Sequence, residues 1–465
     1  MVLGCVANWS LVELPRVNCA ILAGELPGPA LVQALAGSVL VDLPGPESFS
    51  PREAQQLLVH LSFCGASVAR HYQEHDLARR LTPERAFDPL PVGAERVPFR
   101  TYFARLADQT GTGHCHRDSY ASVVRWNLPT AEVHWRGERL AVLPGVFDDS
   151  AIHTYTGDRG ERLFLELMKK AEALELAVNG LLEPLSAGTV GVHGAEAIWR
   201  VRTAATVLTA ARQLMSDFGL LPASEGLRSE HFLDVFRQFA GHWQVGDIPP
   251  SGALDAEALT RDLLLGLDIP DRDEHVRRLF PGLLGTERAE LTRLLGRPPL
   301  PVTVLAELGL DAAVLREMPA TDLRATVRQH PALAAWYQLL TAHARTAGIH
   351  LAVAKKFLFR LARERDLAGL PDMAVVSRRA GTTGMTESLL ERLARARHNH
   401  VLSGLHHIPH LELLALADVD DPEVVPSTEL DTLVRFVGPD VAPTPTPVPV
   451  WLAVPADPAV SPARL

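Results

Sequence analysis

The chain has 465 residues, with 45 Lys and Arg against 55 Asp and Glu, and a formal net charge of −10. A nucleic-acid-binding surface needs clustered excess Lys and Arg, so this acidic balance argues against nucleic acid as a partner. A chain of this length can bury a large core, and its four cysteines form no C-x-x-C pair, which argues against a disulfide scaffold and a cysteine-based zinc site.

The first residues do not have the pattern of a targeting segment. The apolar N-terminus contains Glu13, Arg16 and Glu25, and no basic region precedes a clean apolar stretch, so we expect no signal peptide. No run of 18 uncharged apolar residues occurs, so we expect no membrane partner. Together with the sparse cysteines, these features predict a soluble, cytoplasmic protein.

The N-terminal third is predicted to be a smaller, mixed domain. Prolines interrupt residues 1–50, which predicts an irregular N-terminal arm with short elements. A helix is expected over 51–81, because Pro51 suits a first turn and apolar residues recur on one face. Within the domain at 51–157, the short apolar run 140–147 is either a strand or a buried loop.

Helical periodicity dominates from Asp158 onward. Apolar residues recur at helical spacing between Leu163 and Val178, with Glu and Lys on the other face. The same periodicity predicts helices over 192–218, 229–243, 254–266, 284–295, 319–329, 331–366 and 385–404. Strand-like alternation is almost absent, so we predict an all-α fold with a large helical domain at 158–410.

The residues 411–465 are predicted to be a C-terminal extension. Its end, 439–465, is rich in proline and cannot pack as a helix or a sheet. We interpret this end as an extended tail, with a docking segment for a partner protein as the alternative.

The familiar catalytic motifs are missing, and histidine is the unusual residue. The chain has no phosphate-binding loop, no nucleophile elbow and no H-E-x-x-H, but it has 19 histidines. The alternate positions of His114 and His116 cannot share one helix face, so a metal site there is not favoured. A second group runs from His398 to His410, and we interpret it as a solvated helix end because Pro409 disfavours a regular helix there.

Arg237 stands within the aromatic-rich segment 232–243, which we predict to be helical. A guanidinium is costly to bury without an anionic partner. That partner is either an internal Asp or Glu, or the carboxylate of a ligand, which arginine binds through two parallel hydrogen bonds.

The predicted helix at 331–366 carries His343 and His350 on its apolar face. A histidine on such a face is most often a hydrogen-bonded core residue. Small side chains surround His350, however, so a bulky flat group coordinated by one imidazole could approach the helix closely. The small residues are Ala347, Gly348, Ala352 and Ala354.

A glycine-flanked threonine pair follows about thirty residues later, at Gly381, Thr382, Thr383 and Gly384. Such a loop offers backbone N–H groups and hydroxyls to a small polar ligand. Thr386 is then the expected N-cap of the next helix.

These segments occur in an order that resembles the haem-dependent indoleamine/tryptophan 2,3-dioxygenase superfamily, in particular the monodechloroaminopyrrolnitrin synthase family of pyrrolnitrin biosynthesis. The stretch around His350 looks like the family helix that carries the proximal haem histidine. The loop 381–384 looks like the family's Gly-Thr/Ser-Gly-Gly loop, and 232–243 looks like the helix whose arginine binds the tryptophan carboxylate. The resemblance covers roughly 50–405.

The resemblance implies a haem-binding helical bundle with a smaller N-terminal domain and haem b between the two. It implies an oxygenase or oxidative rearrangement enzyme of secondary metabolism that uses O2 or peroxide. The substrate would be tryptophan, a modified tryptophan, or a related indole or aromatic amino acid.

The resemblance also implies roles for individual residues. His350 would be the axial ligand of the haem iron, and Arg237 would hold the substrate carboxylate. The loop residues Gly381, Thr382, Thr383 and Gly384 would bind the amino group or a propionate. Ser122 and Met168 fall near positions that line the family's substrate pocket.

Three positions depart from the family pattern. The arginine that family members carry three residues before the histidine is Ala347, and Arg345 would replace it beside a propionate. The second glycine of the loop is Thr383, and a tyrosine of the pyrrolnitrin enzyme is Leu358. Two other interpretations stay open: a haem-binding sensor or carrier without oxygenase activity, and a helical interaction protein that docks through its proline tail.

Overall fold

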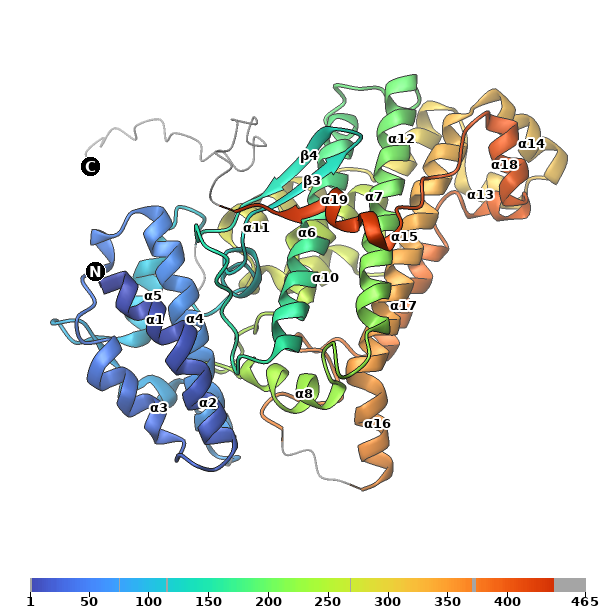
Figure 1. Ribbon diagram of the computed structural model, residues 1–465. Helices are drawn as coiled ribbons and strands as arrows, with labels where there is room; N and C mark the ends of the chain where they lie inside the picture. Colours follow the sequence, from blue (N-terminus) through green and yellow to red (C-terminus); the bar gives the residue numbers. More distant parts are fainter. Residues whose placement is uncertain (1, 75, 114–115, 268, 370–373, 439–465) are drawn as a thin grey trace, which may run out of the picture.

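The computed structural model describes residues 2–74, 76–113, 116–267, 269–369 and 374–438, and Figure 1 shows their arrangement. The chain is predominantly helical, as the periodicity predicts. The helices of the first hundred residues gather on one side, and the long helices α6, α7 and α15 lie on the other (Figure 1). His114, Cys115 and the proline-rich end 439–465 lie outside the described residues.

The first fifty residues are mostly helical, so the prediction of an irregular arm is wrong. The chain runs from Val2 to Leu22 as one helix that contains a π-helical turn. Pro29 begins the next helix, where its missing N–H costs no hydrogen bond, so this proline marks a helix start. The elements are α1 (Val2–Asn8), η1 (Trp9–Glu13), α2 (Leu14–Leu22), α3 (Pro29–Ala34) and η2 (Leu35–Val39).

The helix predicted over 51–81 is α4, Pro51–Gln73, which ends well before residue 81. Ser50 and Glu53 form a reciprocal cap, since the Ser50 N–H donates to Glu53 Oε2 at 2.9 Å and the Glu53 N–H donates to Ser50 Oγ at 3.4 Å. The remaining elements of this part are η3 (Pro46–Ser48), η4 (Arg79–Leu81), η5 (Pro83–Phe87), β1 (Pro91–Val92), β2 (Val97–Pro98), α5 (Phe99–Asp108) and η6 (Ala121–Arg125).

A small antiparallel sheet joins residues 131–143 to the C-terminal extension. Its order is β4-β3-β5, with β3 at Ala131–Trp135, β4 at Glu138–Leu143 and β5 at Val434–Phe436. The apolar run at 140–147 therefore forms a strand in its first residues. β5 pairs Val434 with Val133, so the C-terminal extension returns to the middle of the chain.

Three long helices form the centre of the larger part: α6 (Arg159–Ser186), α7 (Ala195–Leu220) and α15 (Ala332–Ala354). α7 packs against both other helices, and α17 (Glu387–His398) packs on α15. The π-helical turn η10 (Lys355–Phe359) and α16 (Arg360–Leu367) continue α15. The other elements are α8 (Ser229–Asp234), η7 (Phe236–Phe239), η8 (Gly252–Leu254), α9 (Ala256–Leu265), α10 (Arg272–Leu279), η9 (Phe280–Gly282), α11 (Gly285–Leu295), α12 (Leu300–Glu307), α13 (Ala312–Glu317), α14 (Ala320–Gln329), η11 (Ser403–His407), α18 (His410–Ala417), η12 (Ser427–Glu429) and α19 (Leu430–Leu433).

The polar face of α6 is buried, contrary to the amphipathic pattern. Lys169 and Glu172 are 0% exposed and Glu175 is 4% exposed. Arg125 donates to Glu172 at 2.6 Å, and Arg261 pairs with Glu175. These buried charges persist because each has a partner, as buried ions require.

The segment 229–243 is not one helix, which corrects the prediction. α8 ends at Asp234, Val235 has φ −117° and ψ −73°, and the tighter turn η7 follows. Arg365 and Arg378 both pair with the Asp234 carboxylate, which fixes the chain at the break.

None of the described helices is long and apolar enough to cross a membrane.

Candidate functional site

His350 lies in the C-terminal half of α15. Its side chain is exposed and has no hydrogen bond or ion pair with any described residue. Burial nevertheless lowers its pKa to about 4, with Arg397 and Arg261 acting in the same direction. Protein thus surrounds an imidazole that solvent still reaches, and the ring is neutral at physiological pH.

His343 lies two turns earlier on the same face and has the opposite environment. It is 1% exposed, and its Nε2 is 3.3 Å from Asp262 Oδ1. Burial lowers the pKa of His343 to about 4. Although burial raises the pKa of Asp262, Arg397 and His343 hold it well below its usual range. His343 therefore belongs to an internal charge cluster, and His350 is the accessible histidine of the pair.

The helix surface around His350 is open, as the small residues predict. A Cβ added to Gly348 would meet nothing within 4 Å, and Ala352 is exposed. Arg345 is also exposed, but it lies five residues before His350. At 3.6 residues per turn it points about 140° away from the histidine, so it is poorly placed to accompany a group bound there.

A single axial histidine fits this environment better than a bare metal site. Among the described residues, no three His, Cys, Asp or Glu side chains are placed to hold a metal ion. A metal at His350 would therefore have to arrive with its other ligands, as the iron of haem does. The accessible, neutral imidazole and the open helix surface suit such a group.

Arg237 is brought next to the predicted threonine loop. The side chain is 5% exposed, and its two terminal nitrogens donate to the carbonyls of Ser377 and Ala380. The neighbouring Gln238 accepts the Val376 N–H at 2.9 Å and donates to the Val376 carbonyl at 3.2 Å. Residues about 140 positions apart in the sequence are thus fixed together.

The loop 381–384 uses its own N–H groups. The Gly381 N–H donates to the Met385 carbonyl at 2.7 Å, and the Gly384 N–H donates to the Gly381 carbonyl at 2.9 Å. Gly384 has φ +79°, a conformation that favours glycine. The Thr383 hydroxyl is buried and has no partner among the described residues. The loop therefore offers a ligand a hydroxyl rather than these two N–H groups.

Thr382 and Met168 border one short segment, 250–252. The Thr382 hydroxyl donates to the Pro250 carbonyl at 3.5 Å, and a Cβ at Gly252 would lie 3.1 Å from Met168 Cε. Thr386 caps α17 as predicted, since its Oγ1 accepts the Leu389 N–H at 3.3 Å. Two of the predicted site residues, Thr382 and Met168, thus lie next to the same segment.

Sequence reasoning missed Phe164, which lies one helical turn before Met168 on α6. Its ring centroid lies 5.3 Å from that of Phe232 and 5.4 Å from that of Phe236, and all three side chains are half-buried. Phe232 also contacts Phe357, just after α15, at 6.1 Å. Half-buried aromatic rings clustered between α6, α8 and η10 form a surface suited to an aromatic ligand.

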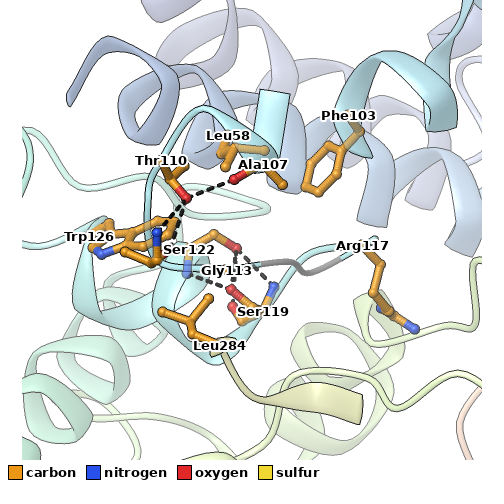
Figure 2. Close-up of a pocket in the computed structure, with 11 residues that line it drawn as sticks. Leu58, Phe103, Ala107, Thr110, Gly113, Arg117, Ser119, Ser122, Trp126 and Leu284 are labelled. Atoms are coloured by element: carbon orange, nitrogen blue, oxygen red, sulfur yellow. Dashed lines mark hydrogen bonds between the residues drawn. The ribbon is translucent and has the colours of Figure 1, made fainter. Parts of the chain in front are cut away.

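Ser122 lines a separate small pocket between the N-terminal helices and Leu284 (Figure 2). Its Oγ accepts hydrogen bonds from the Ser62 hydroxyl and the Ser119 N–H, each at 2.9 Å. The guanidinium of Arg117 turns away from this pocket and pairs with Asp247 at 2.9 Å (Figure 2). The contacts found in the described residues connect Ser122 to the N-terminal helices and not to the loop 381–384.

The histidines near the C-terminus are not all solvated. His400 is 5% exposed, and burial lowers its pKa to about 3. The His398 and His406 rings stack at 4.9 Å. The prediction of a solvated helix end is therefore wrong for His400, because Tyr337 of α15 covers it at 5.8 Å.

No model of a known protein family matches this chain, and no curated protein matches it.

Proposed function

We propose that the chain is a haem-dependent oxygenase, or an oxidative rearrangement enzyme, that acts on tryptophan, a modified tryptophan, or a related indole or aromatic amino acid. The observation that carries the proposal is His350. It is a neutral, accessible imidazole with no hydrogen bond or ion pair among the described residues, on a helix whose surface is open beside it.

His350 would hold haem b through one ring nitrogen. Haem iron, when bound, supplies the activation of O2 or peroxide that side chains cannot provide. The pKa of about 4 keeps the imidazole in the form that coordinates a metal over the whole physiological range. His343 is buried beside Asp262, so we do not expect it to be the haem ligand.

The aromatic rings and the loop 381–384 would bind and orient the substrate. The half-buried rings of Phe164, Phe232 and Phe236 favour an aromatic group through apolar and edge-to-face contacts. Thr383 provides one buried hydroxyl for a polar group. Apolar rings on one side and a fixed loop on the other would exclude water and aim the ring, which is where positioning contributes most.

Absorption spectroscopy on the purified full chain tests the proposal. With haem added, the wild-type protein should show a Soret band. The band should be lost or shifted in His350→Ala and should persist in His343→Ala. Within the part of the chain that the structure describes, His350 has no hydrogen bond or ion pair to lose, so its replacement should leave the apo fold intact, which circular dichroism checks.

Two results would count against the proposal. Loss of the band in His343→Ala alone would mean that the other histidine is the ligand. Absence of a band in all three proteins would remove the cofactor and, with it, the oxygenase.

A further inference from the structure

The guanidinium of Arg397 has hydrogen-bond donors that the described residues do not use. Its Nε donates to Asp262 Oδ1 at 3.0 Å and its Nη2 donates to Asp262 Oδ2, so one edge of the planar group is occupied. A guanidinium also donates from Nη1. The Nη1 of Arg397 has no hydrogen bond with any described residue and is not enclosed, so it is open to a ligand.

Arg397 lies beside the face of α15 that carries His350. The Nε2 of His343 is 3.3 Å from the same Asp262 oxygen that the Nε of Arg397 binds. His350 follows His343 by seven residues, which at 3.6 residues per turn is within about 20° of two full turns. The two histidines therefore project from one face, about 10 Å apart along the helix. Arg397 contacts the group at the near end of that span.

The packing of α17 fixes Arg397 in this place. α17 packs along α15 (Figure 1). Lys355, just after α15, pairs with Glu391 of α17 at 2.7 Å, so His350 lies in the stretch that α17 follows. Burial lowers the pKa of His350 to about 4, and Arg397 is the charged group that lowers it most, followed by Arg261. The charge of Arg397 therefore acts on the imidazole.

A carboxylate is the partner that the open donors of Arg397 favour. Hydrogen bonds from a guanidinium to a carboxylate are charge-assisted, and the side chain is only 13% exposed, so water competes weakly. Haem b carries carboxylates of its own, on its propionate groups. The open coordination position of a haem lies across the macrocycle from the axial histidine. A donor on the His350 side therefore meets the macrocycle rather than the substrate.

We propose that Arg397 binds a propionate of the haem that His350 holds. The proposal rests on the proposed function, because it needs haem at His350. It gives Arg397 the role that the family resemblance gives to Arg345, which points about 140° away from the histidine. The site would then prefer a macrocycle with free acid groups to one without them.

A matched pair of macrocycles tests the contact. Haem b and its dimethyl ester differ only in the esterified propionates, and both are titrated into the full chain with the Soret band as readout. We expect the wild-type protein to bind haem b roughly 10- to 100-fold more tightly than the ester, the size of a hydrogen bond to a charged group. In Arg397→Gln, the ratio of the two dissociation constants should fall to within about threefold of one.

A purely structural role of Arg397 predicts a different result. Loss of a structural contact would weaken both macrocycles by the same factor and leave the ratio unchanged. Arg324→Gln is the matched control, because Arg324 holds the Glu412 carboxylate through the same two nitrogens, Nε and Nη2, in another part of the molecule. Its ratio should equal that of the wild-type protein.

A double variant keeps the test open if Arg397→Gln does not fold. The single substitution leaves the Asp262 carboxylate without the arginine, whereas Asp262→Asn combined with Arg397→Gln removes both charges. Removing both partners of a nearly buried pair costs less than leaving one unpaired. The ratio in the double variant should also approach one.

The outcomes separate this inference from the proposed function. A Soret band in the wild-type protein with equal affinity for both macrocycles, or a ratio that Arg397→Gln leaves unchanged, would overturn the role of Arg397 alone. A preference of the haem-loaded chain for L-tryptophan over tryptamine that Arg397→Gln abolishes, at an unchanged haem ratio, would assign the arginine to a substrate carboxylate instead. No band with either macrocycle would overturn both proposals.

Discussion

Replacing Gly65 by alanine tests how α4 packs against the segment that follows η7. A Cβ at Gly65 would lie 2.4 Å from both Cη2 and Cζ2 of Trp243. The indole is 1% exposed and cannot swing aside, because rings of Phe87, Phe99 and Phe103 lie 5.0, 6.0 and 5.1 Å from it. The substitution therefore forces a shift in a packed aromatic cluster.

Two opposing terms set the size of the effect. Alanine gains about 1 kcal/mol over glycine inside a helix. Overpacking a core costs about 1–3 kcal/mol. Since the indole is enclosed, we expect the upper end of that range and a net loss of about 2 kcal/mol in the free energy of unfolding of Gly65→Ala.

Gly180 of α6 provides the matched control. It is exposed, and a Cβ there would meet nothing within 4 Å. Gly180→Ala should stabilise the chain by about 1 kcal/mol. The helix-propensity gain cancels between the two variants, so their difference of about 3 kcal/mol measures the clash alone.

Urea unfolding followed by circular dichroism gives the two free energies. A Gly65→Ala variant as stable as Gly180→Ala would mean that Trp243 does not fill the space beside α4. Trp243→Phe in the Gly65→Ala background should restore part of the loss, and a double-mutant cycle would give a coupling of about 0.5–3 kcal/mol. Additive effects would refute the contact.

Three further predictions concern charge and cofactor. Burial lowers the pKa of His60 to about 3, so between pH 6.5 and 3 the unfolded chain binds a proton that the folded chain does not. As the pH is lowered through this range, the free energy of unfolding should therefore decrease by about 1.4 kcal/mol per pH unit because of this group. The decrease should be less steep in His60→Gln, as urea titrations at several pH values would show. Asp262→Asn should lower the free energy of unfolding by about 3–5 kcal/mol, because it leaves the Arg397 side chain, only 13% exposed, without its carboxylate partner. Glu412→Gln, at a half-exposed pair, should lower it by less than about 1 kcal/mol, and equal losses in urea unfolding would contradict this. Haem at about 100 times its dissociation constant should add about 2.7 kcal/mol to the wild-type protein and nothing to His350→Ala, measured by thermal unfolding.

The helices that the sequence predicts best are those whose pattern is local. α6, α7 and α15 have apolar residues at helical spacing over many turns, and each is found. The break at Val235 could not be predicted, because Phe232, Phe236 and Phe239 keep helical spacing across it. The break depends on Arg365 and Arg378, more than 130 positions away, and no local pattern reports such partners.

The same limit applies to the candidate site. Small residues around His350 predicted an open helix surface, and the structure has one. Two acceptors of Arg237 among the described residues are backbone carbonyls, which carry no residue signature, so the sequence could not indicate them. The buried charges of α6 were missed for a related reason, since a Glu looks the same in sequence whether water or Arg125 faces it.

His343 is buried and His350 is exposed, and this difference follows from the ion pairs that link α17 to its neighbours. At its C-terminal end, Arg397 binds Asp262, which also meets His343. In the N-terminal half of α17, Glu391 accepts a hydrogen bond from Lys355 at 2.7 Å. Along the sequence, His350 lies between His343 and Lys355, the residues that take part in these two contacts.

Ionic side chains link α17 to its neighbours at both contacts. The Arg397–Asp262 pair contributes more to stability, because its side chains are only 13% and 11% exposed, whereas the Lys355–Glu391 pair is half-exposed and contributes less than about 1 kcal/mol. Removing the Arg397–Asp262 pair should therefore weaken the attachment of α17 to α9. The charge cluster that encloses His343 thus fixes one end of α17, and His350 lies beyond that cluster on α15.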